Sequence, residues 1–529
     1  MDARDATLGA VVREQATAFG EKPFLEFLDR TVSYAELDAR TNSIANGFSA
    51  LGVGAGDNVC LMLPNCVEFV LVWFALSKIG AVEVPVNVAH RGEGLKHVID
   101  NSNATLLVTD EKALEHLGRI VDQTGLRDVV VVADSTNGRL ALPSLEAHSF
   151  SDLLGEPETP PDVAVPPASL HSIMYTSGTT GLPKGVMITH RYFFHYSAGL
   201  ADAVGVDPDD RILMVLPLFH TNPQLFTYGA LLRGATMVLR PGFRASSFWD
   251  EVREHRATVI DCLGIMPMLL YKQPRVPNER DNLVRRAYIV PCPRDIHDSL
   301  TERYDMKIIS SYGSTEANCP VHFTADCDPE KAGSAGKPWG PIEFRIVDDE
   351  DYEVPTGDVG EIVIRSREPW TMFSGYYGNE AGTVEAWRNL WFHSGDRGYV
   401  DGDGYLWFVD RKKEAIRKSG EMLSPLEVER TILEHPAVAE CAVVGVPSEL
   451  GDDDVKAVIV VAEEAFLSAE DIIRFCEGKV AYFMVPRYVE FKDTLPKTPS
   501  ERIEKYKLRD EGVTEACWDR VEAGYELAR

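Results

Sequence analysis

The sequence predicts an α/β fold: a large N-terminal domain of doubly wound sheets with a small β-barrel-like part, then a small α+β C-terminal domain. Three observations predict it. The chain has 529 residues, more than one hydrophobic core usually supports. Apolar runs of strand length alternate with helical patterns up to about residue 330, which is typical of mostly parallel sheets. From residue 340 to 365 the apolar period changes to two, which indicates antiparallel strands.

The N-terminal elements follow one another as a parallel sheet requires. Residues 41–51 read as an amphipathic helix and residues 69–78 as a buried helix, and Lys78 ends the apolar run of residues 69–76. The proline-rich and acidic residues 157–167 read as a surface connection. The expected buried strands up to residue 330 are 58–63, 82–86, 105–109, 129–132, 211–216, 236–239 and 307–310.

The C-terminal part has a different pattern. Antiparallel strands are expected at residues 343–347 and 361–364, with a turn at residues 355–358 between them. A charged stretch at residues 410–414 precedes a region with strand candidates at residues 441–446 and 456–461. The sequence therefore predicts a domain boundary near residue 410, which gives domains of residues 1–410 and 411–529.

Charge and cysteine usage exclude several classes. The net charge of −29 excludes broad nucleic-acid binding and an anionic membrane surface as the main partner. Nine cysteines without a Cys-x-x-Cys pair fit reduced thiols in the cytoplasm and show no zinc spacing. The first residues have no apolar signal segment, and the apolar run at residues 69–76 is too short to span a membrane.

The most informative segment is residues 175–185, Tyr-Thr-Ser-Gly-Thr-Thr-Gly-Leu-Pro-Lys-Gly. Glycines let a backbone approach an anion closely, and successive N–H groups and hydroxyls can then surround phosphate oxygens. The spacing is not that of the G-x-x-x-x-G-K-[ST] loop. An ordinary surface loop is the alternative interpretation.

This segment resembles the phosphate-binding loop of the adenylate-forming (ANL) superfamily: acyl-CoA synthetases, luciferases and the adenylation domains of peptide synthetases. The resemblance extends from about residue 8 to 510. Within the superfamily, the chain is similar to carnitine/crotonobetaine-type and medium-chain acyl-CoA ligases. It implies that the loop wraps the β- and γ-phosphates of ATP. The residues that would do so are Thr176, Ser177, Gly178, Thr179, Thr180, Gly181 and Lys184.

A second motif, Ser311-Tyr312-Gly313-Ser314-Thr315-Glu316, matches a family segment. The resemblance implies that Tyr312 stacks on adenine, that Thr315 contacts the α-phosphate and the acyl carboxylate, and that Glu316 holds Mg²⁺. Mg²⁺ prefers oxygen ligands and bridges carboxylate and phosphate. Neutralising the α-phosphate would let a carboxylate attack it. A plain strand-to-turn junction is the alternative.

A third motif, His393-Ser394-Gly395-Asp396, is followed by Asp410-Arg411. By resemblance, Asp396 and Arg411 bind the ribose hydroxyls, with Ser394 in place of the usual threonine. Taken alone, Asp396 reads as an exposed turn carboxylate.

Other segments extend the resemblance. Lys413 matches the hinge about which the C-terminal domain of such enzymes rotates between half-reactions, and otherwise reads as an exposed turn lysine. Residues 417–429 resemble the loop that lines the pantetheine tunnel for CoA, where Ser419, Gly420 and Glu421 are the candidates. Phe219 and His220 end a segment that borders the acyl pocket in the family, and the pocket walls are expected at residues 219–227 and just before Tyr312.

Two departures stand out. In residues 496–509 the family pattern puts Glu501 at a glycine position and Arg502 at the position of the catalytic lysine. The guanidinium of arginine is wide and planar, whereas the ammonium of lysine is compact. Three interpretations follow: Arg502 supplies the positive charge, Lys505 enters the site in its place, or only one half-reaction is efficient. Pro291 and Cys292 replace a glycine-rich turn and imply a reshaped wall near the acyl group, in which Cys292 reads as a structural thiol.

The sequence therefore predicts an ATP- and Mg²⁺-dependent enzyme that converts a small carboxylic acid to an acyl-adenylate and transfers the acyl group to CoA. A half-reaction enzyme and a nucleotide-binding protein without turnover are the alternatives. A carrier protein in place of CoA and a homodimer are possible partners.

Overall fold

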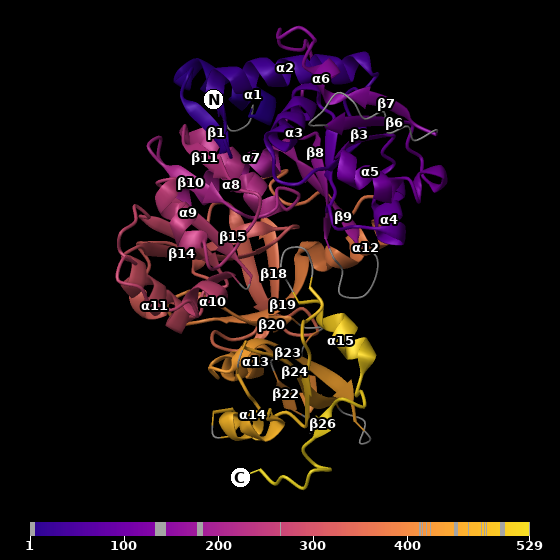
Figure 1. Cartoon of the computed structure of the whole chain (residues 1–529). Coiled ribbons are helices and arrows are strands. Elements are labelled where there is room, and N and C mark those ends of the chain that lie inside the picture. The colour runs from indigo at the N-terminus through magenta and orange to yellow at the C-terminus, as the bar shows by residue number, and fades with distance from the viewer. Residues whose placement is uncertain are drawn as a thin grey trace. The chain divides into compact units, whose positions relative to one another are not determined.

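The computed structural model describes residues 6–132, 144–176, 183–264, 266–411, 414, 416–418, 421–423, 425–448, 453–463, 465–477, 479–480, 482, 484–497 and 503–527. Packing divides the chain into two units (Figure 1), Met1–Phe344 with Ile364–Phe392, and Arg345–Val363 with His393–Arg529. The predicted α/β class, with a large sheet-based part and a small C-terminal part, is confirmed. The boundary near residue 410 stays a prediction.

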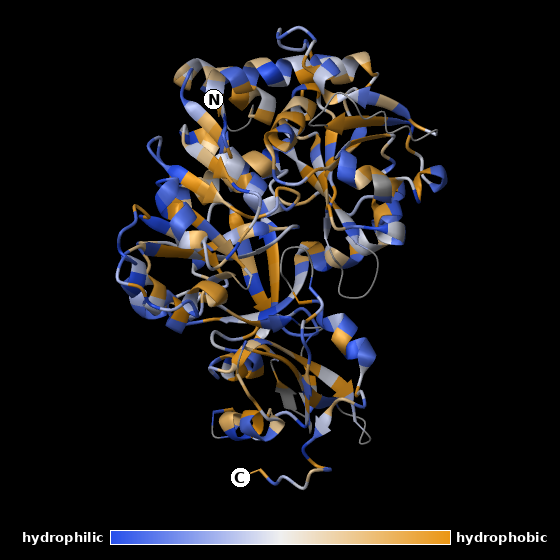
Figure 2. Ribbon diagram, in the orientation of Figure 1, coloured by the Kyte–Doolittle hydropathy of each residue, from blue (hydrophilic) through white to orange (hydrophobic). Residues whose placement is uncertain are grey.

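The first sheet of the larger unit has seven strands and is parallel except at one end. Its order is β7 (Glu146–Ser149), β6 (Asp128–Val132), β5 (Leu106–Asp110), β3 (Asn58–Met62), β4 (Val82–Pro85), β8 (Leu170–Thr176) and β9 (Lys184–Thr189). The last two strands form an antiparallel hairpin. Most strand residues are apolar, as the hydrophobic colouring in Figure 2 shows. Most are also buried, because both faces of a doubly wound sheet are covered.

The second sheet has nine strands, with antiparallel strands at its edges. Its order is β16 (Lys337–Pro338), β15 (Asn318–Phe323), β14 (Lys307–Ser314), β13 (Arg286–Val290), β12 (Val259–Leu263), β10 (Arg211–Met214), β11 (Thr236–Leu239), β1 (Pro23–Phe27) and β2 (Arg30–Ser33). Strands β14, β13, β12, β10 and β11 pair in parallel, so their carboxyl ends share one edge.

Two helices show how the sequence sets local structure. Helix α2 (Tyr34–Ala50) starts at a capping box between Ser33 and Glu36. Helix α3 (Val67–Ile79) is buried all round. Lys78 lies in its last turn, where the side chain is buried and its Nζ donates to Asp38 and Asn42, both at 2.6 Å. Burial lowers the pKa of Lys78 to about 8.

Further helices of the larger unit are α1 (Leu8–Phe19), α4 (Gly92–Ser102), α5 (Glu111–Leu117), α6 (Phe150–Leu153), α7 (His190–Val204), α8 (Thr221–Arg233), α9 (Phe248–Glu254), α10 (Met266–Tyr271), α11 (Arg294–Tyr304) and α12 (Glu380–Ala386). Helices α7 and α8 pack against each other. Within the described residues, no helix combines the length and the apolar character that a bilayer crossing requires.

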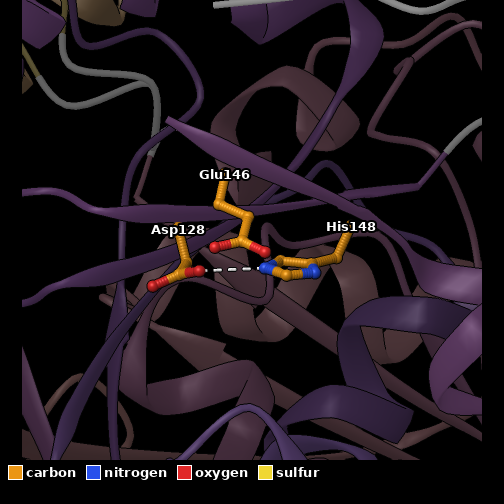
Figure 3. A group of neighbouring side chains, drawn as sticks. All are labelled: Asp128, Glu146 and His148. Atoms are coloured by element: carbon orange, nitrogen blue, oxygen red, sulfur yellow. Dashed lines mark hydrogen bonds and ion pairs between the residues drawn. The ribbon is translucent and has the colours of Figure 1, made fainter. Parts of the chain in front are cut away.

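Edge strand β7 is tied to its neighbour by side chains. His148 Nε2 and Asp128 Oδ1 lie 2.9 Å apart, and the carboxylate of Glu146 lies beside them (Figure 3). Parallel register puts Asp128 opposite Glu146 and Val130 opposite His148, so the three polar side chains share one face. These three side chains form a partly exposed cross-strand contact at the edge of the sheet, in which the His148–Asp128 hydrogen bond stabilises the strand pair.

The C-terminal elements form smaller sheets. Strands β17 (Ile342–Val347), β18 (Gly360–Ser366), β19 (Phe392–Val400) and β20 (Leu406–Arg411) make one sheet. Strands β23 (Val438–Pro447), β24 (Asp453–Val461), β25 (Tyr488–Phe491) and β26 (Trp518–Asp519) make another, and β21 (Ile416–Lys418) pairs with β22 (Glu421–Leu423). Helices α13 (Pro425–Leu433), α14 (Ala469–Cys476) and α15 (Lys505–Glu511) accompany them, and Val428, Ile432 and Ile472 belong to the apolar core.

Candidate active site

The hairpin of β8 and β9 carries the ends of the predicted phosphate loop. Thr176 and Lys184 face each other across the two strands, and Thr176 Oγ1 lies 3.5 Å from the carbonyl oxygen of Lys184. The hairpin therefore brings the first and last predicted loop residues together. Ser177, Gly178, Thr179, Thr180 and Gly181 lie outside the described residues.

A distant segment, residues 374–377, runs along β9. The amide of Ser374 donates to Met187, and the amide of Tyr377 donates to Gly185, at 2.9 and 2.8 Å. This pairing puts the ring of Tyr376 4.7 Å from Nζ of Lys184, an exposed side chain.

Tyr376 also reaches the second motif, because its hydroxyl donates to Oε1 of Glu316 at 2.9 Å. The structure thus brings Lys184 and Glu316 to one place through a residue that the motif analysis did not single out. The signal for it was the glycine and tyrosine cluster Ser374-Gly375-Tyr376-Tyr377-Gly378.

The second motif forms the turn between β14 and β15. A side chain at Gly313 would put its Cβ 1.7 Å from the carbonyl oxygen of Asn318, so only glycine fits. Two backbone contacts hold the turn: Tyr192 Oη donates to the carbonyl oxygen of Thr315 at 2.7 Å, and Phe373 N donates to that of Glu316 at 3.0 Å. The side chain of Glu316 is thereby held at a fixed place.

Glu316 fits the chemistry of a magnesium ligand. Its carboxylate is partly exposed, and Tyr376 engages one of its oxygens. No described residue hydrogen-bonds the other oxygen, which leaves a hard oxygen donor of the kind that Mg²⁺ takes together with phosphate and water.

His220 and Phe219 lie where α8 begins. His220 caps this helix without a side-chain cap bond, and its ring lies 4.6 Å from that of Phe219. Burial, with a contribution from His90, lowers the pKa of His220 to about 4. Its Nε2 has no hydrogen-bond partner among the described residues. His220 is therefore neutral near pH 7.

The predicted ribose pair is adjacent in the structure. Asp396 and Arg411 face each other across β19 and β20, with Nε of Arg411 3.2 Å from Oδ1 of Asp396. Asp396 is buried rather than an exposed turn carboxylate. The turn before it is held by Glu361, whose Oε1 accepts the amide of Gly395 at 3.2 Å. Glu361 is a further residue that the motifs did not indicate.

Most of the candidate functional residues in the C-terminal part lie outside the part of the chain that the structure describes. Lys413, Ser419, Gly420, Glu501 and Arg502 lie outside the described residues, as does the side chain of Glu421.

Lys505 is described, and it is engaged elsewhere. Its Nζ lies 2.8 Å from Glu429 Oε1 and 3.5 Å from Glu414 Oε2. Glu429 is buried on α13 and also accepts the amide of Val443. In this structure Lys505 ties α15 to α13.

Comparisons with known proteins show the family of this chain. The chain matches the family model of AMP-binding enzymes over residues 12–377 and that of the C-terminal domain of AMP-binding enzymes over residues 427–502. It is 34% identical over 510 residues to a protein of Salmonella typhimurium named crotonobetaine/carnitine–CoA ligase, covering 93% of this chain and 97% of that protein.

Solved structures show the same fold. The anthranilate CoA ligase AuaEII in complex with anthranoyl-AMP is similar with a TM-score of 0.86 and 26% identity, over 97% of this chain and 99% of that one. ATP-bound MatB from Rhodopseudomonas palustris is similar with a TM-score of 0.85 and 27% identity, over the same shares of the two chains.

These similarities confirm the predicted resemblance and activity, and they do not favour the half-reaction enzyme or the binding protein without turnover. The chain is an AMP-forming acyl-CoA ligase and belongs to the family of AMP-binding enzymes.

Proposed function

We propose that this ligase activates a small organic acid on ATP at Lys184, Thr315 and Glu316 and then transfers the acyl group to free CoA. The observation that supports it is the contact series from Lys184, at the loop end of the β8–β9 hairpin, through Tyr376 to Glu316. It places a cation and a carboxylate on the same tyrosine, an arrangement that suits a metal-bound polyphosphate.

Each motif has a role in this proposal. The loop from Thr176 to Lys184 holds the β- and γ-phosphates, and Tyr312 stacks on adenine. Asp396 and Arg411 bind the ribose hydroxyls. Thr315 orients the α-phosphate and the attacking carboxylate, while Phe219 and His220 border the acyl group. Because His220 is neutral, one of its ring nitrogens can accept a hydrogen bond from the CoA thiol. A neutral ring also does not interact as a charge with the phosphates or the carboxylate.

Glu316 would hold Mg²⁺. When bound, the ion neutralises charge on the phosphates as the carboxylate oxygen attacks phosphorus and pyrophosphate leaves. Lys184 adds a fixed positive charge, and Tyr376 keeps the Glu316 carboxylate in place.

The C-terminal domain, from about residue 411, is proposed to rotate about Lys413 between the half-reactions. Arg502 supplies positive charge in the first, and Ser419, Gly420 and Glu421 line the passage for pantetheine in the second. We place the enzyme in the cytoplasm. A carrier-protein pantetheine as acceptor, or a homodimer as the assembly, is the alternative arrangement.

The test is a panel of carboxylic acids assayed twice. Carboxylate-dependent ATP–pyrophosphate exchange measures adenylation, and CoA-dependent thioester formation measures transfer. We expect one class of acid to support both. Exchange without thioester from CoA points to another thiol acceptor, and failure of every acid in both assays contradicts the proposal.

A further inference from the structure

The edge strand β7 and its neighbour β6 carry a group of metal-ligating side chains that the nucleotide motifs do not use. Asp128, Glu146 and His148 each offer one oxygen or nitrogen atom, and these three atoms lie within 4.8 Å of one another. Figure 3 shows the two carboxylates and the imidazole ring facing one another. Imidazole nitrogen together with carboxylate oxygen is a ligand combination that divalent transition metals take in proteins.

Backbone pairing brings the three side chains together. Asp128 and Glu146 are Cα partners across the two parallel strands, and His148 lies two residues beyond Glu146, so it shares the same face of the sheet. The amide of Glu146 donates to the carbonyl oxygen of Arg127 at 2.9 Å, which secures this register. The side chains of His148 and Asp128 are only 18% and 29% exposed. The group is therefore built on paired strands rather than on a loop.

The charges of this group call for a cation. Asp128 and Glu146 lie directly opposite each other, and like charges in this position destabilise a strand pair. His148 Nε2 and Asp128 Oδ1 are hydrogen-bonded at 2.9 Å. The carboxylate of Glu146 has no hydrogen bond or ion pair with any other described residue, and no described lysine or arginine pairs with Asp128. A bound metal ion would balance the two carboxylates at once.

The distances suit an ion of the size of zinc. Zinc lies about 2.0–2.2 Å from nitrogen and oxygen ligands, so neighbouring ligand atoms around it are about 3.0–3.6 Å apart. The 2.9 Å between His148 Nε2 and Asp128 Oδ1 is already close to this spacing. Glu146 is exposed and has room to turn its carboxylate towards the other two. Water would complete the coordination, because the group is open to solvent on one side.

The group is separate from the nucleotide site. Asp128 and Glu146 are the first residues of β6 and β7, whereas Thr176, where the phosphate loop begins, is the last residue of β8. Strands β7, β6, β5, β3, β4 and β8 pair in parallel, so the two places lie at opposite edges of the same sheet. A metal ion here would not be the one that Glu316 is proposed to hold.

We propose that Asp128, Glu146 and His148 bind one divalent transition-metal ion, with zinc as the ion that the ligands suit best. The ion would join β7 to β6 and so stabilise this edge of the sheet. The histidine gives the site its selectivity, because Mg²⁺ takes oxygen ligands and demands a near-octahedral set of them.

The test is isothermal titration of the full chain with Zn²⁺ alone, without nucleotide. His148→Gln and Glu146→Gln each remove one ligand, and we expect each to weaken the binding of one Zn²⁺ equivalent by at least about tenfold. The matched control is His297→Gln. His297 is 15% exposed and its Nδ1 lies 2.9 Å from Oδ1 of Asp298, but Arg294 takes the place of a second carboxylate beside that aspartate. The control should bind Zn²⁺ as the wild type does.

Unfolding in denaturant is the second readout, since an ion that binds only the folded chain raises the free energy of unfolding. Zn²⁺ should stabilise the wild type and His297→Gln more than His148→Gln. Equal Zn²⁺ affinity in the wild type and in either ligand variant overturns the proposal, and so does displacement of this Zn²⁺ by an equal concentration of Mg²⁺. Glu146→Gln changes an exposed side chain, so it keeps the test decisive if His148→Gln does not fold. Neither readout depends on catalysis, so they remain valid whether or not the proposed function holds.

Discussion

The hydroxyl of Tyr376 donates a 2.9 Å hydrogen bond to Oε1 of Glu316. The face of the same ring lies 4.7 Å from Nζ of Lys184. One tyrosine thus links the lysine that ends the phosphate loop to the acid that would hold the metal. The link depends on backbone pairing between residues 374–377 and β9, so the two motifs are positioned by a third segment.

Replacing Tyr376 with phenylalanine tests this link. The ring remains under Lys184, but the Glu316 carboxylate loses its donor. A hydrogen bond to a charged group contributes about 1.5–3 kcal/mol, so we expect KM for Mg·ATP in pyrophosphate exchange to rise by about tenfold or more.

The matched control is Tyr377→Phe. The hydroxyl of Tyr377 accepts a hydrogen bond from Asn58 Nδ2 at 3.1 Å, whereas that of Tyr376 donates to Glu316. This variant should keep the wild-type KM for Mg·ATP. Equal effects of the two variants would show that the segment, rather than the Tyr376 hydroxyl, matters.

Local patterns predicted the strands because each is an apolar run with its own end signals. Strand β11 spans the predicted residues 236–239, and β3 begins at the predicted residue 58. The family resemblance assigned Asp396 and Arg411 to the same ribose, and the two side chains are adjacent in the structure. The burial of Lys78 was not predicted, because its partners Asp38 and Asn42 lie on another helix.

The rest depends on pairing between distant segments. Tyr376 joins the site because residues 374–377 pair with β9, and Gly395 is held by Glu361 of the neighbouring strand β18. Neither contact leaves a periodic pattern in the sequence. A glycine or an acid in an apolar run marks such a place, but it does not identify the partner.

The proposed metal role of Glu316 predicts a specific change in Glu316→Gln. The amide keeps an acceptor for Tyr376 but loses the charge that would hold the ion. We expect exchange to fall by about 100-fold or more and the Mg²⁺ concentration for half-maximal rate to rise. A Mg²⁺ titration of exchange measures both. Loss of rate with an unchanged Mg²⁺ dependence would exclude Glu316 as the metal ligand.

Buried histidines predict acid lability. Burial lowers the pKa of His220 from 6.5 to about 4, and that of His322 likewise to about 4. Between pH 6.5 and 4 the unfolded chain binds a proton that the folded chain does not. The free energy of unfolding therefore falls as pH drops through this window, by up to about 1.4 kcal/mol per pH unit for each histidine, and levels off below it.

His220→Gln should remove one such contribution. Denaturant unfolding at several pH values between about 4.5 and 7.5 measures the slope of the unfolding free energy against pH. We expect a shallower slope in His220→Gln and, independently, in His322→Gln. A slope equal to that of the wild type in both variants would mean that these imidazoles gain protons in the folded state.

Lys505 is expected to stabilise the C-terminal unit rather than to act in chemistry. Lys505→Met leaves the buried carboxylate of Glu429 without its lysine, which should destabilise this unit by about 3 kcal/mol. The double variant Lys505→Met with Glu429→Leu should recover part of the loss, because no charge stays unpaired. Chemical denaturation measures the stability, and exchange per folded molecule should stay at the wild-type value.

Arg502 is the residue of the C-terminal domain proposed to supply positive charge in the adenylation step, and Arg502→Lys tests this proposal. Lysine carries a compact ammonium at the end of a flexible side chain, whereas the arginine guanidinium is wide and planar. Since both side chains are positively charged, we expect the rate of pyrophosphate exchange to rise by only about three- to tenfold. This is less than the effect of removing a hydrogen-bond donor to the transition state. Thioester formation from supplied acyl-adenylate should not change, because it is proposed to use the other face of the C-terminal domain. If exchange is unaffected or falls in Arg502→Lys while Lys505→Met abolishes it in folded protein, the assignment of the two residues must be reversed.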